Sequence, residues 1–309
     1  MKRVVGYLLA TLVLVLALNA YVAWHPLYRG KTARIDRLYG QLAARDAGGC
    51  AAAAPRTLVL GNSYVDRSFL PGEDCGFVKF TVSGMPLRDA ARIVTNLQPG
   101  QRIGRVVIGV GYNDANPVES DSSIYMRYWA STPWYRALWA MPLVRGRGMS
   151  LTLAKEDVKC LLGKRPCART RSRDDNAGAG PSGGVRSSGQ FATSVRTRYA
   201  EYEPYVRSVS TQLRNEIESI VAACRQHGMP LLVYTAPIAP SLQRHLDPRF
   251  VTAFHEQIRS TGVDYVDFNE RYADWGSSYF LDATHVNETG GHIVTTQLMT
   301  MFGSEPLRP

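Results

Sequence analysis

The sequence is poor in cysteine and lacks the cysteine and histidine patterns that bind metals. Its five cysteines include no CxxC pair and no cluster with the spacing of a zinc site. We therefore expect no metal and no other cofactor. Cys50 with Cys75, and Cys160 with Cys167, could instead close short loops in an oxidising compartment, while Cys224 is expected in the core.

The sequence also lacks the motifs of nucleic-acid-binding modules. The formal net charge of +10 favours attraction to anionic surfaces such as membranes, acidic polysaccharides or nucleic acid. Much of the excess, however, is arginine scattered through loops, without an aromatic and basic strand motif or zinc-finger spacing. We therefore expect no nucleic-acid partner.

Charged residues are absent from one long stretch near the N-terminus. After Lys2 and Arg3, about twenty residues up to Trp24 carry no charge, which is long enough to cross a bilayer as one helix. Residues 1–24 are therefore predicted to be an uncleaved transmembrane anchor, with a cleaved signal peptide as the alternative. The flanking charges leave the orientation open, because basic residues also follow the span closely: Arg29, Lys31, Arg34 and Arg37.

Beyond the anchor, short apolar runs alternate with helical patterns. Residues 25–55 are expected to form a linker that contains a connecting helix, and a domain is expected over 56–305. Five runs read as strands: 57–60, 77–82, 105–110, 231–235 and 263–267. Helices are expected near 86–97, 201–227, 249–259 and 288–302. This alternation predicts an α/β domain with a parallel sheet covered on both faces.

The alternating pattern is interrupted between about 115 and 195. An aromatic segment at 125–142 is followed by a Gly-, Ser- and Arg-rich stretch at 174–190, which is expected to be a disordered loop. Trp129 and Trp134 are candidates for stacking on a sugar. Core packing, or a helix lying on the membrane, is the alternative for these aromatic residues.

A small polar serine, Ser63, follows the first predicted strand in the stretch LGNSYVD. Alone, this pattern is typical of a turn or a helix cap. Serine becomes a nucleophile only where a base takes its proton and an acceptor orients that base. Asp282 and His285 lie three residues apart just past the fifth strand, whereas the other histidines lack this combination of position and nearby carboxylate.

Acyl transfer also needs hydrogen-bond donors for the oxyanion of its tetrahedral intermediate. The backbone N–H groups of Ser63 and Gly84 and the side-chain amide of Asn113 are candidates, because each follows a predicted strand. In a parallel sheet, ligands bind at the carboxyl ends of the strands. We therefore expect these groups along one rim of the sheet.

Four short blocks carry a resemblance to a known family: GNS at 61–63, the glycine of SGMP at 84, GYND at 111–114 and DATH at 282–285. In this order they resemble the SGNH (GDSL-like) hydrolase superfamily, over about 57–302. The resemblance implies a three-layer α/β/α fold with a flavodoxin-like parallel sheet of about five strands. The implied roles are nucleophile for Ser63, oxyanion donors for Gly84 and Asn113, base for His285 and its orienting group for Asp282.

One position departs from the family pattern, because Asn62 replaces the aspartate of GDS. With the anchor, this variant block is more similar to bacterial envelope members, such as those in alginate O-acetylation and teichoic acid D-alanylation, than to secreted lipases. That likeness implies a single-pass protein of the bacterial inner membrane with its catalytic domain in the periplasm. Arg67 and Arg88 are candidates for binding an anionic acceptor, and Tyr112 for lining the site.

The predicted function is acyl transfer, with acetyl as the favoured group, through a serine ester. The acceptor would be a hydroxyl of an envelope polysaccharide or other glycan, and a polytopic membrane protein would donate the acyl group. Two alternatives stay open. One is a carbohydrate or lipid esterase that uses the same triad, and the other is a non-catalytic scaffold that binds polysaccharide or assembly partners.

Overall fold

The structure is a computed structural model of the 309-residue chain. It describes residues 2–43, 55–72, 76–116, 125–129, 133–145, 157, 188–203 and 208–304. The chain divides into two compact units, one of residues 1–40 and 121–180, the other of residues 41–120 and 181–309. Cys50, Cys75, Cys160, Cys167 and the predicted loop up to residue 187 lie outside the described residues.

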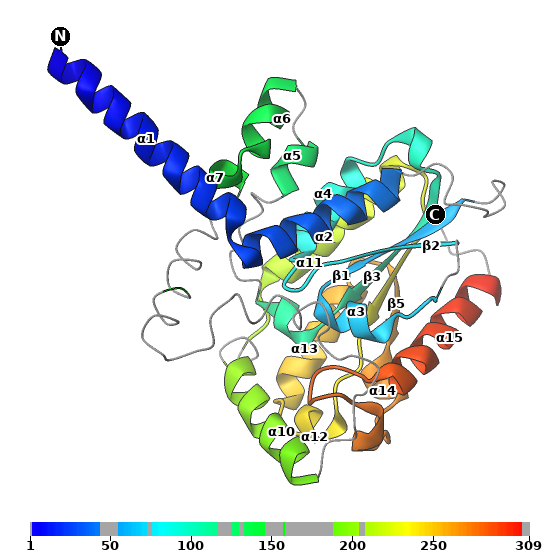
Figure 1. The fold of residues 1–309 in the computed structure, drawn as a ribbon. Helices are drawn as coiled ribbons and strands as arrows, with labels where there is room; N and C mark the ends of the chain where they lie inside the picture. Colours follow the sequence, from blue (N-terminus) through cyan, green and yellow to red (C-terminus); the bar gives the residue numbers. More distant parts are fainter. Residues whose placement is uncertain are drawn as a thin grey trace. The chain divides into compact units, whose positions relative to one another are not determined.

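The second unit is built on five parallel strands. They are β1 (Arg56–Gly61), β2 (Phe77–Thr81), β3 (Ile103–Val110), β4 (Leu231–Thr235) and β5 (Asp264–Asp267), in the order β2-β1-β3-β4-β5 (Figure 1). This is the flavodoxin-like order of a doubly wound sheet. The predicted fold class and the five predicted strands are therefore confirmed.

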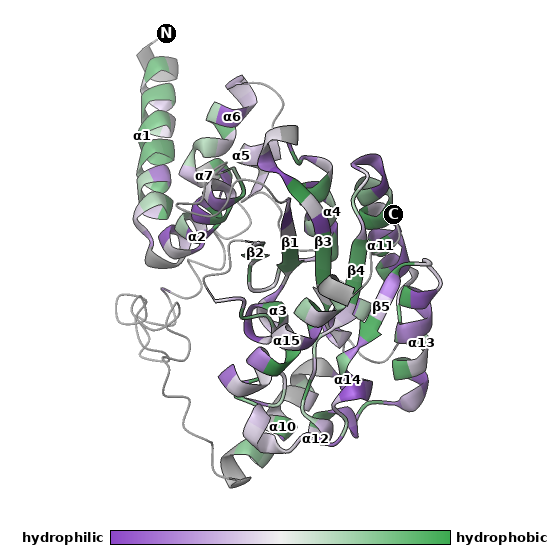
Figure 2. Ribbon diagram, turned by 90° about the vertical axis from the view of Figure 1, so that its right-hand side faces the viewer, coloured by the Kyte–Doolittle hydropathy of each residue, from purple (hydrophilic) through white to green (hydrophobic). Residues whose placement is uncertain are grey.

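Helices cover both faces of this sheet. On one face, α11 (Thr211–Gln226) packs against α4 (Leu87–Thr95) and α13 (Pro248–Arg259). On the other, α15 (Glu288–Ser304) packs against α3 (Ser63–Ser68). Figure 2 shows the apolar strands between these helix layers. Because both faces are covered, β4 is buried along its whole length and reads as a continuous apolar run.

The remaining described elements of this unit are short, apart from α10 (Ser188–Tyr202). They are η1 (Pro99–Gln101), η2 (Tyr112–Ala115), α12 (Pro240–Gln243), α14 (Phe268–Arg271) and η4 (Ser277–Tyr279).

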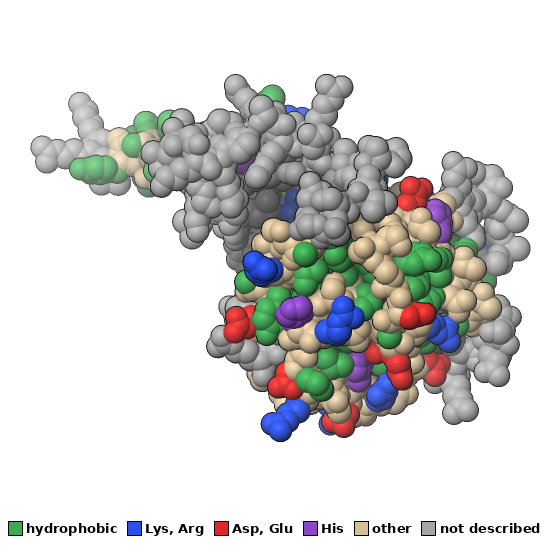
Figure 3. All heavy atoms as spheres, turned by 90° about the horizontal axis from the view of Figure 1, so that it is seen from below, with side chains coloured by type: hydrophobic (Ala, Val, Ile, Leu, Met, Phe, Trp, Pro, Cys, Tyr) green, Lys and Arg blue, Asp and Glu red, His purple; other side chains and the backbone are tan. Residues whose placement is uncertain are grey.

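The face in Figure 3 mixes basic and acidic side chains, so the positive charge does not form a single patch on the described part of that face.

The helix predicted over 201–227 is wrong at its N-terminal end. α11 begins only at Thr211, because the side chain of Ser210 accepts a hydrogen bond from the N–H of Gln212 at 3.1 Å and caps the helix. The apolar Val209 precedes this cap, so its helical spacing with later residues is coincidental. Part of the predicted stretch belongs instead to α10, which ends at Tyr202.

The first unit is helical in its described residues. α1 (Lys2–Trp24) contains one stretch, Val5–Trp24, that is long and apolar enough to cross a membrane and is almost entirely exposed. It is followed by α2 (Pro26–Ala43), which occupies much of the predicted linker. The aromatic segment forms three short helices: α5 (Met126–Trp129), α6 (Pro133–Ala140) and α7 (Pro142–Arg145).

Two glycines let α3 lie directly on the sheet. A Cβ atom added to Gly61 on β1 would lie 2.1 Å from Cγ2 of Val65, and one added to Gly109 on β3 would lie 2.2 Å from the same atom. Neither strand could therefore carry a larger residue here without moving α3. Because α3 begins at Ser63, these glycines also set the position of that serine.

We predict that Gly109→Ala destabilises the protein by about 1 to 3 kcal/mol, because overpacking forces a well-packed helix off its strand. The free energy of unfolding of the full chain in detergent, followed by urea titration, measures this. Gly276→Ala is the matched control, since its nearest contact would be 3.7 Å away. Equal stability of the two variants would contradict the close contact between α3 and the sheet.

Candidate active site

Ser63 lies where the chain turns from β1 into α3, and the preceding residue, Asn62, caps the helix. The side-chain oxygen of Asn62 accepts a hydrogen bond from the N–H of Tyr64 at 3.0 Å, and Asn62 is the N-cap of α3. Ser63 is therefore the first residue of the helix and its hydroxyl is not needed for capping. Its side chain is partly exposed, at the carboxyl end of β1.

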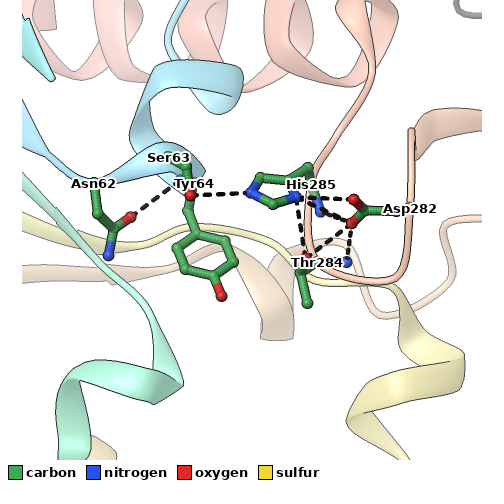
Figure 4. A network of polar contacts seen from close by, with 6 residues as sticks. All are labelled: Asn62, Ser63, Tyr64, Asp282, Thr284 and His285. Atoms are coloured by element: carbon green, nitrogen blue, oxygen red, sulfur yellow. Dashed lines mark hydrogen bonds and ion pairs between the residues drawn. The ribbon is translucent and has the colours of Figure 1, made fainter. Parts of the chain in front are cut away.

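Ser63, His285 and Asp282 form one hydrogen-bonded line, which Figure 4 shows. Nε2 of His285 lies 3.1 Å from Oγ of Ser63, although the two residues are 222 positions apart in the chain. Nδ1 of His285 lies 3.1 Å from each carboxylate oxygen of Asp282. With the proton on Nδ1, His285 donates to Asp282 and can accept the proton of the serine hydroxyl.

Asp282 is held as a carboxylate by four donors. Its Oδ1 accepts hydrogen bonds from the N–H of Thr284 at 2.8 Å, from the Thr284 hydroxyl at 2.8 Å and from the N–H of His285 at 3.0 Å, in addition to the ring. Burial raises the pKa of this carboxyl, but the hydrogen bonds from His285 and Thr284 outweigh burial and hold the pKa well below its usual range. Asp282 is therefore ionised at neutral pH.

The ring of His285 is also fixed from the side, by Tyr64. The two rings are stacked with centroids 5.1 Å apart and an interplanar angle of 12° (Figure 4). Sequence reasoning missed both Tyr64 and Thr284. Thr284 had a detectable signal, because an aspartate that accepts from the N–H two residues later forms a common turn. The stacking of Tyr64 had none.

The strand order brings the predicted oxyanion donors to either side of Ser63. β1 pairs with β2 and with β3, so the turn after β1 lies between the turn that carries Gly84 and the turn that carries Asn113. The N–H of Val82 donates to the carbonyl of Gly61 at 3.1 Å, which joins the first two turns. The N–H groups of Ser63 and Gly84 donate to no other described residue.

Gly84 and Asn113 are placed by their local backbone. Gly84 has φ +70°, in a turn closed by the hydrogen bond from the N–H of Met85 to the carbonyl of Val82 at 2.9 Å, and this conformation favours glycine. Asn113 lies in η2 and packs against Gly111, where a Cβ would come within 2.7 Å of its Oδ1. That amide oxygen is buried without a hydrogen-bond partner among the described residues.

A buried carboxylate, Asp114, joins the turns after β1 and β3. Its Oδ2 accepts hydrogen bonds from the N–H of Gly111 at 2.8 Å and from Nδ2 of Asn62 at 3.3 Å. Burial raises the pKa of Asp114 to about 7, and the nearby Glu216 adds to this, while the two donors oppose it. An aspartate at position 62 would set two carboxyls against each other, so asparagine suits this turn.

Two predicted binding residues, Arg88 and Tyr112, lie outside the line of Ser63, His285 and Asp282. Arg88 lies at the start of α4 and is partly exposed, so its binding of an anionic acceptor stays a prediction. Tyr112 is fully buried against Phe250 and Phe254 of α13 and is a core residue, which corrects the prediction that it lines the site. A strand-end position alone did not show which way its ring would turn.

For three further predicted binding residues, the predicted role is neither supported nor contradicted by their position. Arg67 lies one turn after Ser63 on α3 and is partly exposed, so it stays a candidate. Trp129 stacks on Tyr125, with centroids 5.4 Å apart, and Trp134 is 70% exposed. Both tryptophans belong to the first unit, and their role in substrate binding stays a prediction.

A second histidine and carboxylate pair lies in the core. Nε2 of His255 lies 3.1 Å from Oδ2 of Asp267, and both side chains are buried. The sequence does not indicate this pair, because it forms only when α13 packs against β5. Its other ring nitrogen lies 2.6 Å from the hydroxyl of Tyr265. Ser63 is not part of this network, so His285 is the histidine of the candidate site.

No group of three or more His, Cys, Asp or Glu side chains among the described residues could hold a metal ion. What the site offers is a serine with an oriented base, and free N–H groups beside it. This arrangement can attack a carbonyl carbon and stabilise the resulting oxyanion.

Comparisons with known proteins find likenesses in structure only. No protein-family model and no curated protein matches the chain. A candidate acylhydrolase from Bacteroides fragilis NCTC 9343 matches with a TM-score of 0.43 and 12% identity, covering 88% of this chain and 97% of its own. A GDSL-like lipase from Bacteroides thetaiotaomicron VPI-5482 matches with a TM-score of 0.41 and 9% identity, covering 88% and 97%.

A third solved structure, from Streptococcus pneumonia and described as a candidate platelet activating factor, matches with a TM-score of 0.44 and 10% identity, covering 89% of this chain and 95% of its own. At these TM-scores the chemistry of this chain has to be argued from its own site.

The raised pKa of Asp114 predicts a pH-dependent stability. Folding raises this pKa from 3.8 to about 7, so the native state binds the proton more tightly than the unfolded chain. The stability from this proton is complete below about pH 4 and is lost as the pH rises towards about 7. Asp114→Asn removes the titration. Relative to the unchanged chain, its free energy of unfolding should therefore rise by about 2 to 3 kcal/mol between about pH 5 and pH 8.

Urea titrations of both chains at a series of pH values measure this difference, and exposed Asp274→Asn is the control. A difference between Asp114→Asn and the unchanged chain that stays constant with pH would show that Asp114 ionises normally.

Proposed function

We propose that the chain is a serine-dependent enzyme of SGNH type that cleaves or transfers ester-linked acyl groups. The observation that carries the proposal is the line from Oγ of Ser63 through His285 to Asp282, with both steps at 3.1 Å. The proposal is supported by the position of Ser63 directly after β1, at the edge of a parallel sheet where α/β proteins bind ligands.

The reaction follows from these contacts. Oγ of Ser63 attacks the ester carbonyl while Nε2 of His285 takes the hydroxyl proton, and the ionised Asp282 stabilises the resulting imidazolium. The N–H groups of Ser63 and Gly84 and the amide of Asn113 donate to the oxyanion. The intermediate then collapses, His285 returns the proton to the departing alkoxide, and an acyl ester on Ser63 remains.

A second hydroxyl completes the cycle. His285 takes its proton, the oxygen attacks the acyl ester, and the proton returns to Ser63 as the new product leaves. Water gives a carboxylic acid, whereas a sugar hydroxyl gives an acylated glycan. The two activities share every residue named above and differ only in the acceptor.

We infer that transfer of an acetyl group to an envelope or exopolysaccharide glycan is the physiological reaction. The apolar span of α1 supports a membrane-bound location, and the net charge of +10 suits an acidic glycan. The likeness of the sequence to envelope members supports a domain in the periplasm of a bacterial inner-membrane protein. A polytopic membrane protein would then supply the acyl group.

The esterase is the alternative that uses the same triad. A non-catalytic scaffold is less well supported, because it has no need for an oriented base. The four donors that hold Asp282 ionised beside His285 favour chemistry over scaffolding.

Ser63→Ala should lower kcat for an activated acetyl ester by about 10³-fold or more, because it removes the nucleophile while the oxyanion donors remain. Release of the leaving group from p-nitrophenyl acetate by the full chain measures this. Ser260→Ala, an exposed serine at the end of α13, is the matched control. Undiminished activity of Ser63→Ala would exclude the serine ester mechanism.

Asp282→Asn should lower kcat by about 10³- to 10⁴-fold with a smaller change in KM, because an amide no longer stabilises the imidazolium. Thr284→Ala should lower kcat by about tenfold, since only one of the four donors to Asp282 is lost. An Asp282→Asn variant with the kcat of the unchanged chain would show that Asp282 does not orient the base.

The acceptor is decided by product analysis. The full chain is incubated with an activated acetyl ester, with and without candidate glycans, next to Ser63→Ala. Acetylated glycan that depends on Ser63 supports the transferase, and acetate alone supports the esterase. Glycan binding without Ser63-dependent chemistry supports the scaffold. An alkaline phosphatase fusion after residue 40 tests the topology, and an inactive fusion would exclude the periplasmic location.

A further inference from the structure

The apolar helix α6 (Pro133–Ala140) is exposed along most of its length. None of its residues is buried. Trp134 is 70% exposed and Tyr135 is 52% exposed, and Met141, which follows the helix, is 43% exposed. Large apolar side chains this exposed, and next to one another, mark a surface that binds something.

α6 is held near one end of the apolar span of α1. α7 packs against α1 and also against α6. Figures 1 and 2 both show α7 beside the C-terminal end of α1, where Val22 is buried. The rest of the apolar span is almost entirely exposed.

Contacts of polar and aromatic side chains fix this arrangement to the second half of α2 (Pro26–Ala43). Nη2 of Arg145, at the end of α7, lies 2.6 Å from Oδ1 of Asp36. The hydroxyl of Tyr128 donates to the same carboxylate, and the Tyr128 ring stacks on Tyr39 with centroids 3.7 Å apart. The segment that carries α6 is therefore tied to α2, the helix that follows the span.

We propose that α6 lies in the headgroup region of the phospholipid bilayer that α1 crosses. Tryptophan and tyrosine favour this region, because their rings are apolar while the N–H and O–H groups stay hydrated. Trp24, at the C-terminal end of α1, is 74% exposed and is a further aromatic residue at the end of the span. Arg136, exposed on α6, can reach lipid phosphates.

This surface gives the first unit a second contact with the membrane. A single span leaves the attached residues free to rotate about the helix axis and to tilt. An interfacial helix that packs, through α7, beside the end of that span restricts both motions.

The test uses the depth of single tryptophans. The chain has five, Trp24, Trp129, Trp134, Trp139 and Trp275. Full-length variants that keep only Trp134, only Trp24 or only Trp275, with phenylalanine at the other four positions, are reconstituted into phosphatidylcholine and phosphatidylglycerol vesicles. Fluorescence is then compared between vesicles with and without bromine near the headgroup end of the acyl chains.

Trp134 emission should fall at least twofold in brominated vesicles and resist aqueous acrylamide, while Trp275, in the second unit, should respond to neither bromine nor the presence of vesicles. Trp134 emission that brominated lipid quenches no more than Trp275 overturns the proposal. If acrylamide also fails to quench it, a protein surface covers α6 instead of lipid.

The inference rests on the proposed anchor, and the Trp24 variant separates the two. If bromine quenches Trp24 but not Trp134, α1 crosses the membrane and α6 does not lie in it. If bromine quenches neither tryptophan, both the proposed anchor and the proposed position of α6 are wrong. A second check needs only one substitution at a time. In the otherwise unchanged chain, Trp134→Phe should remove part of the fluorescence that bromine quenches, whereas Trp275→Phe should leave that part unchanged.

Discussion

The pairing of β1 between β2 and β3 is the constraint on which the candidate site depends. Parallel strands end on the same edge of a sheet, so this order sets the turns with Ser63, Gly84 and Asn113 side by side. The pairing needs α3 to leave β1 at once and lie against the strands, which Gly61 and Gly109 allow. A different strand order would separate the same three residues.

Two buried carboxyl groups support this edge, and their pKa values are shifted in opposite directions. Asp282 has four donors, and they hold its pKa far below normal despite burial. Asp114 has two donors and faces Glu216, so burial prevails and its pKa is raised to about 7. The number of donors thus separates a permanent charge, which a histidine base requires, from a group that joins two turns through Asn62 and Gly111.

Local sequence patterns predicted the strands and the pair of Asp282 and His285, because both depend on short-range rules. Apolar runs of strand length indicated five strands, and all five form. Asp282 and His285 are three residues apart and meet within one turn, so their spacing carried the information. The same reasoning failed for the start of α11, where the cap at Ser210 outweighed an apolar spacing that continued through Val209.

The sequence by itself determined which residues could do the chemistry and on which strand ends they lie, because strand length and turn residues are local properties. Only the tertiary structure decided that His285 meets Ser63 across 222 positions, that Tyr64 stacks on the ring of His285, and that Tyr112 is buried in the core. Those outcomes depend on which face of the sheet each helix covers and on what fills the space beneath it. Packing sets both, and no short stretch of sequence contains that information.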